Sequence, residues 1–216
     1  MHTEQAREQM VEQQVRAWDV LDERVLAVMR SVPRERFVPD QQRFLAFADV
    51  EIALAHTQHM LRPSVAGKLL QALDLLGSEH VLEVGTGSGF VTACLAEMSQ
   101  TVRSVEIFSD LAELARANLA HLDVANVQVV NGDALQLPQD TRFEAIALTA
   151  SLPAYDERWE RQLAVGGRLF VVVGEAPIME ARLVRRLSEE TWTSESLFET
   201  IVDPLRNAWR PEEFSF

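Results

Sequence analysis

The sequence predicts an α/β fold: a doubly wound, mostly parallel sheet with helices on both faces and a helical cap at the N-terminus. Three observations predict it. From His80 onward, short apolar segments alternate with helix-like segments, an order typical of parallel sheets with helical crossovers. The first apolar segment runs directly into a glycine-rich turn at residues 85–89. Residues 1–78, in contrast, place their apolar side chains mainly at helical spacing.

The N-terminal third is predicted to be mainly helical with irregular connections. Residues 5–18 and 22–32 both repeat apolar side chains every three or four positions, and a proline ends the second segment. Residues 37–62 show no sustained period and are predicted to be a loop with at most a short strand. A further helix is expected to begin at Pro63, because proline is tolerated in a first turn, and to end at Gly77 as its C-cap.

The strand pattern follows as short runs of apolar and β-branched residues. Five strands are predicted, at residues 80–84, 102–107, 127–130, 143–148 and 167–174. Helix-like segments are expected at residues 90–98, 109–122 and 154–163. From Ile178 the pattern changes, and it fits either two amphipathic strands or a strand and a helix around a polar turn.

The composition indicates one folded domain with an acidic surface. The 216 residues include 33 acidic and 20 basic residues, which gives a formal net charge of −13. The fractions of 47% hydrophobic and 25% charged residues are typical of a globular protein, and the length fits a single domain. A strongly negative chain lacks the positive footprint that nucleic acids and anionic membranes require, so we expect neither as a partner. The sequence leaves the oligomeric state open.

The cysteine content and the N-terminus bear on the compartment. Cys94 is the only cysteine, so no intramolecular disulfide can form, and it follows the glycine turn on an apolar segment where a core position is expected. The N-terminal segment lacks the pattern of a signal peptide. No run approaches the roughly 18 to 20 apolar residues of a membrane-spanning helix. We therefore expect a cytoplasmic protein.

The glycine turn, VLEVGTGSGF at residues 81–90, predicts a cofactor site. A buried strand leads into Gly85, Gly87 and Gly89, and a helix follows from Phe90. Glycines allow a sharp turn and a close approach of the backbone to a ligand, while the following helix N-terminus presents free N–H groups. This arrangement is typical of loops that bind nucleotide-type cofactors.

Two acidic residues strengthen the cofactor prediction. Glu106 ends the second strand, 21 residues after Gly85, where a carboxylate can accept both ribose hydroxyls. Asp133 follows the third strand, where a carboxylate can accept a hydrogen bond from the edge of an adenine ring. Either acid alone is more typical of a solvated turn. Together with the glycine turn, at the same edge of a parallel sheet, they favour a ligand.

The spacing and charge of the turn favour S-adenosylmethionine over NAD. A dinucleotide turn reads G-x-G-x-x-G, whereas this one reads G-x-G-x-G. Glu83 lies two positions before the first glycine, where its carboxylate would repel a pyrophosphate but suits a ligand that carries an ammonium and a sulfonium. An NAD-dependent oxidoreductase is therefore the least favoured alternative.

Beyond the glycine turn and Glu106, several further segments bear a family resemblance. The chain resembles the protein-L-isoaspartate O-methyltransferases in NGDA at 131–134, LTASLP at 148–153, LAVGGRLFVVVG at 163–174 and, upstream, VLAVMRSVPRERFVPD and FADVEIALAHTQHMLRPSVAGKLLQAL. The resemblance covers roughly residues 10–188. It implies a Rossmann-like methyltransferase with S-adenosylmethionine as methyl donor. It also implies a protein or peptide substrate, whose abnormal isoaspartyl carboxylate accepts the methyl group.

The resemblance also implies which residues hold the cofactor. The methionine part would lie among Glu83, Gly85, Thr86, Gly87, Ser88 and Gly89. Ribose and adenine would lie beside Glu106 and Ile107, and the adenine edge beside Asp133 and Ala134, where family members usually have glycine in place of alanine. We expect one domain over residues 1–216, divided into a substrate-side cap (1–78), a cofactor-binding core (79–175) and a C-terminal extension (176–216).

The chain departs from the family at the acceptor side. Family members carry a G-Q-T-I-S-x-P pattern, whose serine is usually assigned to catalysis and falls here on Leu61, while its threonine falls on His59. Leucine cannot donate a hydrogen bond to a carboxylate. Three nearby side chains are weak candidates for a replacement donor: Thr57, His59 and Ser64. Arg62 is a possible partner of an acidic substrate.

Two alternatives follow from this departure. The isoaspartyl methyltransferase is the leading hypothesis; the alternatives are a regulatory S-adenosylmethionine-binding homologue that has lost isoaspartyl activity and a methyltransferase for a small-molecule acceptor. Absence of a general base does not argue against a carboxylate acceptor, because a carboxyl with a pKa of about 4 is already ionised at neutral pH.

No metal site is expected, since the pair His56 and His59 has no further Cys or His nearby.

Overall fold

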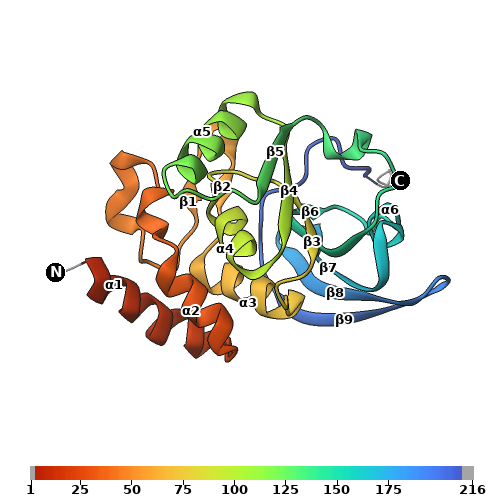
Figure 1. Ribbon diagram of the computed structural model, residues 1–216, viewed down its shortest axis with the longest axis horizontal. Coiled ribbons are helices and arrows are strands. Elements are labelled where there is room, and N and C mark those ends of the chain that lie inside the picture. Colours follow the sequence, from red (N-terminus) through yellow and green to blue (C-terminus); the bar gives the residue numbers. More distant parts are fainter. Residues whose placement is uncertain (1–2, 211–216) are drawn as a thin grey trace.

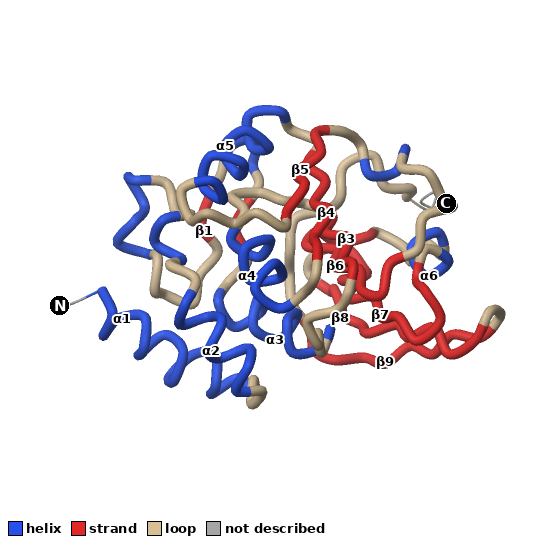
Figure 2. Tube along the Cα trace, viewed as in Figure 1, coloured by secondary structure: helices blue, strands red, loops and turns tan. Residues whose placement is uncertain are grey.

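The computed structural model describes residues 3–210, and it confirms the predicted fold class (Figures 1 and 2). The α-helices are α1 (Thr3–Met10), α2 (Glu23–Ser31), α3 (Pro63–Leu73), α4 (Phe90–Met98), α5 (Ser109–Ala120) and α6 (Arg158–Arg161). The strands of the main sheet are β3 (His80–Val84), β4 (Thr101–Glu106), β5 (Val127–Asn131), β6 (Phe143–Leu152), β7 (Leu163–Glu175), β8 (Ile178–Ser188) and β9 (Thr191–Glu199). A small separate sheet contains β1 (Ile52–Ala53) and β2 (His59–Met60).

The main sheet has the strand order β5-β4-β3-β6-β7-β8-β9. The first five of these strands are parallel to their neighbours, and β8 and β9 are added antiparallel at one end. The chain starts at β3, moves outward to β4 and β5, and then crosses back to β6 on the other side of β3. Strand β3 is therefore the switch point of the sheet, and ligands of open α/β sheets bind at the carboxyl end of such a strand.

Helices cover the two faces of the sheet unequally. Helices α4 and α5 pack on β4 and β5, and α3 packs on β6 and β7, while α6 packs on β7 and β8 (Figure 1). The side chains of alternate strand residues enter two separate hydrophobic clusters, one containing Val81 and Phe170 and the other Leu82 and Leu169. Helix α6 lies on the other face of the sheet from α4 and α5. The connections from β3 to β5 cross the sheet in one direction and the connection from β6 to β7 crosses it in the other, and right-handed crossovers of opposite direction lie on opposite faces.

The N-terminal segment packs against the helical face as a cap. After α1 the chain continues as a helical stretch to Trp18, and α2 follows, as the sequence predicted. Figure 2 shows these helices gathered at one end of the molecule, away from the β8–β9 hairpin. Residues 37–62 form 3₁₀ turns and the two-residue strands β1 and β2, close to the expected loop.

Two predicted helix boundaries are wrong. Helix α3 ends at Leu73, where Asp74 adopts a left-handed conformation, and not at Gly77. The helix predicted over 154–163 is confined to α6, because the Asp156 carboxylate accepts a hydrogen bond from the backbone N–H of Arg158 and starts the helix only there. Residues 178–199 form two strands, β8 and β9, which settles the alternatives left open by their sequence.

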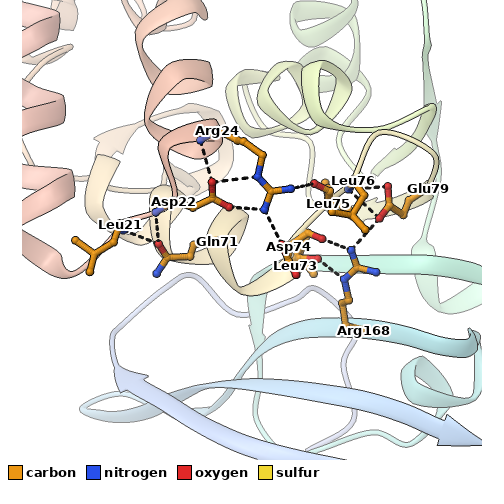
Figure 3. A network of polar contacts seen from close by, with 10 residues as sticks. All are labelled: Leu21, Asp22, Arg24, Gln71, Leu73, Asp74, Leu75, Leu76, Glu79 and Arg168. Atoms are coloured by element: carbon orange, nitrogen blue, oxygen red, sulfur yellow. Dashed lines mark hydrogen bonds and ion pairs between the residues drawn. The ribbon is translucent and has the colours of Figure 1, made fainter.

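Side chains from distant segments fix the early end of α3 (Figure 3). The Arg168 guanidinium, on β7, donates to the carbonyl oxygens of Leu73 and Asp74 and forms an ion pair with Glu79 (2.9 Å). Burial raises the pKa of Glu79, but the hydrogen bonds from Arg168 and from the N–H of Leu76 outweigh it and leave the pKa lowered. Arg168 thus satisfies helix-terminal carbonyls that no local residue satisfies.

Glu79→Gln is expected to destabilise the protein by about 3 kcal/mol, because it leaves the nearly buried Arg168 without its anion. Urea unfolding with and without the substitution measures this difference. Glu157→Gln is the matched control, since it removes an exposed carboxylate from the Arg161 ion pair and should change stability little. Equal effects of the two substitutions would contradict the role assigned to Glu79.

None of the helices over residues 3–210 combines the length and the apolar character that crossing a membrane requires.

Candidate active site

A cavity of about 710 Å³, partly open to solvent, lies at the carboxyl ends of the parallel strands. Each strand contributes residues near or just beyond its end: Gly85 and Gly87 after β3, Glu106 from β4, Asp133 after β5 and Thr149 from β6. The sequence pattern placed the first four of these residues at this edge, but not Thr149.

Thr149 explains why glycine is required at the start of the turn. Its Oγ1 donates to the carbonyl oxygens of Val84 (2.9 Å) and Gly85 (2.6 Å). A Cβ at Gly85, whose φ is +97°, would lie 2.3 Å from that same Oγ1. The side chain therefore fills the space that glycine leaves, and it holds the turn against β6.

Glu83 lies behind the wall of the cavity and does not line it. Its carboxylate is fully buried, and Oε2 accepts hydrogen bonds from Thr92 (2.5 Å) and Ser104 (2.6 Å). The Ser104 hydroxyl is also bonded to Thr86 (2.6 Å), a residue of the turn. Burial raises the pKa of Glu83 to about 7, and the nearby Glu106 adds to this increase. The structure thus places Glu83 as a support of the turn.

Glu106 is held at the cavity wall by backbone donors. Its Oε2 accepts from the N–H of Gly87 (2.9 Å) and its Oε1 from the N–H of Phe108 (3.1 Å). Each oxygen of an ionised carboxylate has capacity for a further hydrogen bond, so the group can still accept from a ligand. These bonds connect the glycine turn to the end of β4 and fix the direction of the carboxylate.

Asp133 lines the cavity just after β5, next to Ala134. Its Oδ1 accepts from the N–H of Leu135 (2.9 Å) and begins a 3₁₀ turn, while Oδ2 accepts from the side chain of Asn207 (3.0 Å). Asn207 belongs to the C-terminal segment, whose approach to the cavity no sequence pattern indicated. Ala134 lines the cavity and is buried, so its extra methyl group is accommodated.

The C-terminal segment forms one wall of the cavity. Residues 202–206 line it, and the N–H and carbonyl groups of Ser151 bond to the backbone of Asp203 and Leu205 (both 2.8 Å). Arg206 donates to the carbonyl oxygen of His56 (3.1 Å). Sequence reasoning missed this wall, because the contacts join residues more than 50 positions apart and have no local signature.

Aromatic stacking attaches the loop before β2 to Phe108, a residue that lines the cavity. The His56 imidazole stacks on Phe108 with ring centroids 4.1 Å apart, and it pairs with Asp110 (2.8 Å). This hydrogen bond lowers the pKa of Asp110. The loop before β2 is therefore attached to the start of α5, beside the apolar wall that Ile107 and Phe108 form.

A second, smaller pocket of about 330 Å³ adjoins the first. The two share the segment 59–61, the glycine turn and Thr149 as walls. The second pocket is lined in addition by two residues of the turn, two of α4 and one of the cap: Thr86, Ser88, Phe90, Val91 and Arg34.

Of the three candidate donors, only His59 lines these pockets. Its Nδ1 is 3.0 Å from an Asp203 carboxylate oxygen, and because an ionised carboxylate only accepts, Nδ1 is the donor. Thr57 instead donates to the carbonyl oxygen of His56 (2.6 Å), outside the cavity. Ser64 is fully buried and bonded through its hydroxyl to Asp49 (2.8 Å).

The groups around His59 are mainly acidic. The pKa of Glu51 is raised, mainly because the carboxyl is partly buried. The nearby Asp203 also raises this pKa, whereas His59 and Arg62 lower it. Arg62 donates to the Thr200 hydroxyl (3.3 Å) and lines a shallow neighbouring groove. Leu61, at the family's serine position, contributes an apolar surface to both pockets.

His56 and His59 each pair with a different acid, Asp110 and Asp203. Within residues 3–210, no three His, Cys, Asp or Glu side chains gather in a way that could hold a metal ion.

The fold and the site together define a class I methyltransferase: a sheet switched at β3, a G-x-G-x-G turn after that strand and an acid at the end of the next. Comparison with known families is more specific. Residues 5–207 match the model of the family "Protein-L-isoaspartate(D-aspartate) O-methyltransferase (PCMT)". The chain belongs to this family.

Individual relatives of this chain carry the name of the same family. The chain is 41% identical over 202 residues to protein-L-isoaspartate O-methyltransferase 1 of Rhodopseudomonas palustris strain HaA2, covering 92% of this chain and 82% of that one. It is 39% identical over 207 residues to protein-L-isoaspartate O-methyltransferase 2 of Pelobacter propionicus, covering 95% and 92% of the two chains.

Solved structures share the fold. A candidate protein-L-isoaspartate O-methyltransferase from Plasmodium falciparum, crystallised with S-adenosyl-L-homocysteine, superposes with a TM-score of 0.81 at 19% identity, over 93% of this chain and 98% of that one. Another structure, of a protein-L-isoaspartate O-methyltransferase, superposes with a TM-score of 0.79 at 22% identity, over 92% and 65% of the two chains.

The buried Glu83 carboxyl should make stability fall as the pH rises. Its pKa is about 7 in the folded protein against an ordinary value of 4.5, so the neutral form favours folding below pH 4.5, and this contribution is lost progressively up to about pH 7. Its size is on the order of 3 kcal/mol.

Urea unfolding of the ligand-free protein at several pH values measures this loss. The stability of Glu83→Gln relative to the parent should increase from pH 4.5 to 7.5, whereas Glu97→Gln, an exposed carboxylate on α4, should follow the parent. A pH-independent difference between Glu83→Gln and the parent would refute the shifted titration.

Proposed function

We propose that the protein transfers a methyl group from S-adenosylmethionine to the isoaspartyl carboxylate of damaged proteins. One observation carries this proposal: the segment 59–61, at the family's acceptor position, forms the wall shared by the large cavity and the adjoining pocket. A methyl donor in the first and a carboxylate at the second would therefore meet at one boundary. Membership of the family supports the choice of substrate.

The residues of the large cavity fit S-adenosylmethionine. Glu106 is aimed by two backbone N–H groups and offers free lone pairs to ribose hydroxyls. Ile107 and Phe108 offer a flat apolar wall for adenine, and Asp133 retains acceptor capacity at its edge. The glycine turn would hold the amino-acid part. When bound, S-adenosylmethionine supplies an electrophilic methyl group on a sulfonium centre.

The acceptor chemistry asks little of the protein beyond positioning. A carboxylate is ionised at neutral pH, so no residue has to remove a proton from it. The site must desolvate and orient this anion toward the cofactor cavity. Apolar Leu61 and Met60 exclude water at the shared wall, and a hydrogen-bond donor is still required to hold the carboxylate.

His59 is our candidate for that donor. Asp203 fixes the ring through Nδ1, which leaves Nε2 as the nitrogen that has no partner among the described residues. In its protonated form, Nε2–H can donate to the acceptor carboxylate, and the acids Asp203 and Glu51 compensate the added charge. This role replaces the hydroxyl that the family carries at the position of Leu61.

The proposed division of labour follows the three parts of the chain. Within residues 1–78, the described part forms a cap that brings His59 to the acceptor side, and residues 79–175 bind the cofactor. Residues 176–216 provide, within their described part, the wall that carries Asp203. We propose that the three parts act as a single domain, because the cavity takes residues from each of them.

Glu106→Gln is expected to weaken S-adenosylmethionine binding about tenfold or more. An amide NH₂ would face the N–H of Gly87 or Phe108 and could no longer accept from both the backbone and ribose. Isothermal titration calorimetry measures the affinity, with the exposed Glu113→Gln on α5 as the control. Unchanged affinity in Glu106→Gln would remove Glu106 from the ribose site.

The activity itself is tested with an isoaspartyl peptide and the same peptide carrying a normal aspartyl residue. We expect methylation of the isoaspartyl peptide only. His59→Leu should raise the KM for that peptide about tenfold or more while cofactor affinity stays constant, since one charge-assisted hydrogen bond is lost.

Leu61→Ser added to His59→Leu restores the family's hydroxyl and should recover part of this loss. If the parent protein methylates neither peptide, the proposed function is wrong. Normal kinetics of His59→Leu would refute only the role of His59.

A further inference from the structure

Arg34 is a buried cation at the back of the proposed active site. It lies in a 3₁₀ turn of the cap, and its side chain has essentially no exposed surface. Burial of an arginine without an anionic partner is unfavourable, so such residues are usually paired with an acid or a ligand. Arg34 forms no ion pair with any residue in the range 3–210.

Two of the three guanidinium nitrogens are committed to the backbone. Nε donates to the carbonyl oxygen of Ala46 (3.1 Å) and Nη2 to that of Leu61 (2.8 Å). The third, Nη1, is buried and has no hydrogen-bond partner in the described part of the chain. Asp49 raises the pKa of Arg34 through its charge, but within the described residues it forms neither a hydrogen bond nor an ion pair with the guanidinium, and its carboxylate accepts from the N–H and hydroxyl of Ser64.

The surroundings of the guanidinium are the walls of the second pocket. Arg34 itself lines this pocket, its Cζ lies 4.7 Å from the centroid of the Phe90 ring, and Leu61 accepts its Nη2–H bond. Phe90 and Leu61 line the same pocket, together with Thr86 and Ser88 of the glycine turn. Nη1 and Nη2 belong to one guanidinium, and Nη2 is bonded to Leu61, so Nη1 lies near the segment 59–61 that separates the two pockets.

The charge of Arg34 persists at working pH. Burial lowers the pKa of its guanidinium to about 10, which still leaves it protonated at neutral pH. A planar guanidinium with one unused N–H edge is suited to a carboxylate, and the face of the Phe90 ring, 4.7 Å from Cζ, offers no acceptor for that edge.

We propose that Arg34 binds a carboxylate in the second pocket through its Nη1. This inference rests on the proposed function. Both ligands of the proposed reaction carry this group. It is either the amino-acid carboxylate of the cofactor or the isoaspartyl carboxylate of the acceptor, and the two sources predict different measurements.

Calorimetry with two cofactor analogues tests the first source. The probes are S-adenosylhomocysteine and 5′-S-(3-aminopropyl)-5′-thioadenosine, which lacks only the carboxylate. If the cofactor is the source, Arg34→Gln weakens binding of S-adenosylhomocysteine about tenfold or more and leaves binding of the decarboxylated analogue unchanged. Arg34→Lys keeps the charge and should retain part of the affinity.

Steady-state kinetics tests the second source. If the acceptor is the source, both analogues bind Arg34→Gln as they bind the parent, while the KM for the isoaspartyl peptide increases about tenfold or more and kcat changes less. Arg36→Gln is the matched control, because Arg36 is exposed in the same 3₁₀ turn and should change neither quantity.

The outcomes separate the two proposals. Suppose that the parent binds S-adenosylhomocysteine and methylates the peptide, and that Arg34→Gln and Arg34→Lys differ from it only in a lower thermal stability. Arg34 then has a purely structural role, and the inference is wrong. If Arg34→Gln does not fold, Arg34→Lys decides between these results. If the parent protein neither binds the analogue nor methylates the peptide, the proposed function fails, and the inference fails with it.

Discussion

The parallel arrangement of β3, β4, β5 and β6 is the constraint on which the rest of the structure depends. Because these strands end at one edge and the chain reverses its direction of travel at β3, the turn after β3 has an open crevice above it and not a neighbouring crossover. The glycine turn, Glu106 and Asp133 enter that crevice by the geometry of the sheet alone. The cap and the C-terminal segment then close its sides, and they supply His59 and Asp203.

Two buried ionisable side chains, Glu83 and Arg34, support this edge from behind. Glu83 is connected through Ser104 to the glycine turn, and Arg34 is connected through its guanidinium to the carbonyl oxygen of Leu61. Cys94 is influenced by both: burial raises the pKa of its thiol, Arg34 lowers it and Glu83 raises it. Burial of such groups is unfavourable unless hydrogen bonds compensate it, and here those bonds connect them to Thr92 and Ser104 and to the backbone of Ala46 and Leu61.

Local patterns were sufficient to predict the five strands, α4, the glycine turn and the two acids, because alternation, glycine spacing and strand ends are all encoded within a few residues. Long-range contacts were not predictable. The end of α3 depends on Arg168, almost 100 positions away, and the need for Gly85 depends on Thr149. The choice of His59 over Thr57 and Ser64 likewise depends on Asp203 and Asp49, which only the folded chain brings together.

The central claim is that the acceptor carboxylate lies between His59 and the cofactor cavity. A crystal structure of the protein with S-adenosylhomocysteine and an isoaspartyl peptide tests it most directly. We expect a peptide carboxylate oxygen about 3 Å from Nε2 of His59, with Nδ1 of the ring still paired to Asp203. A carboxylate bound away from the wall formed by residues 59–61, with Nε2 facing solvent, would contradict it.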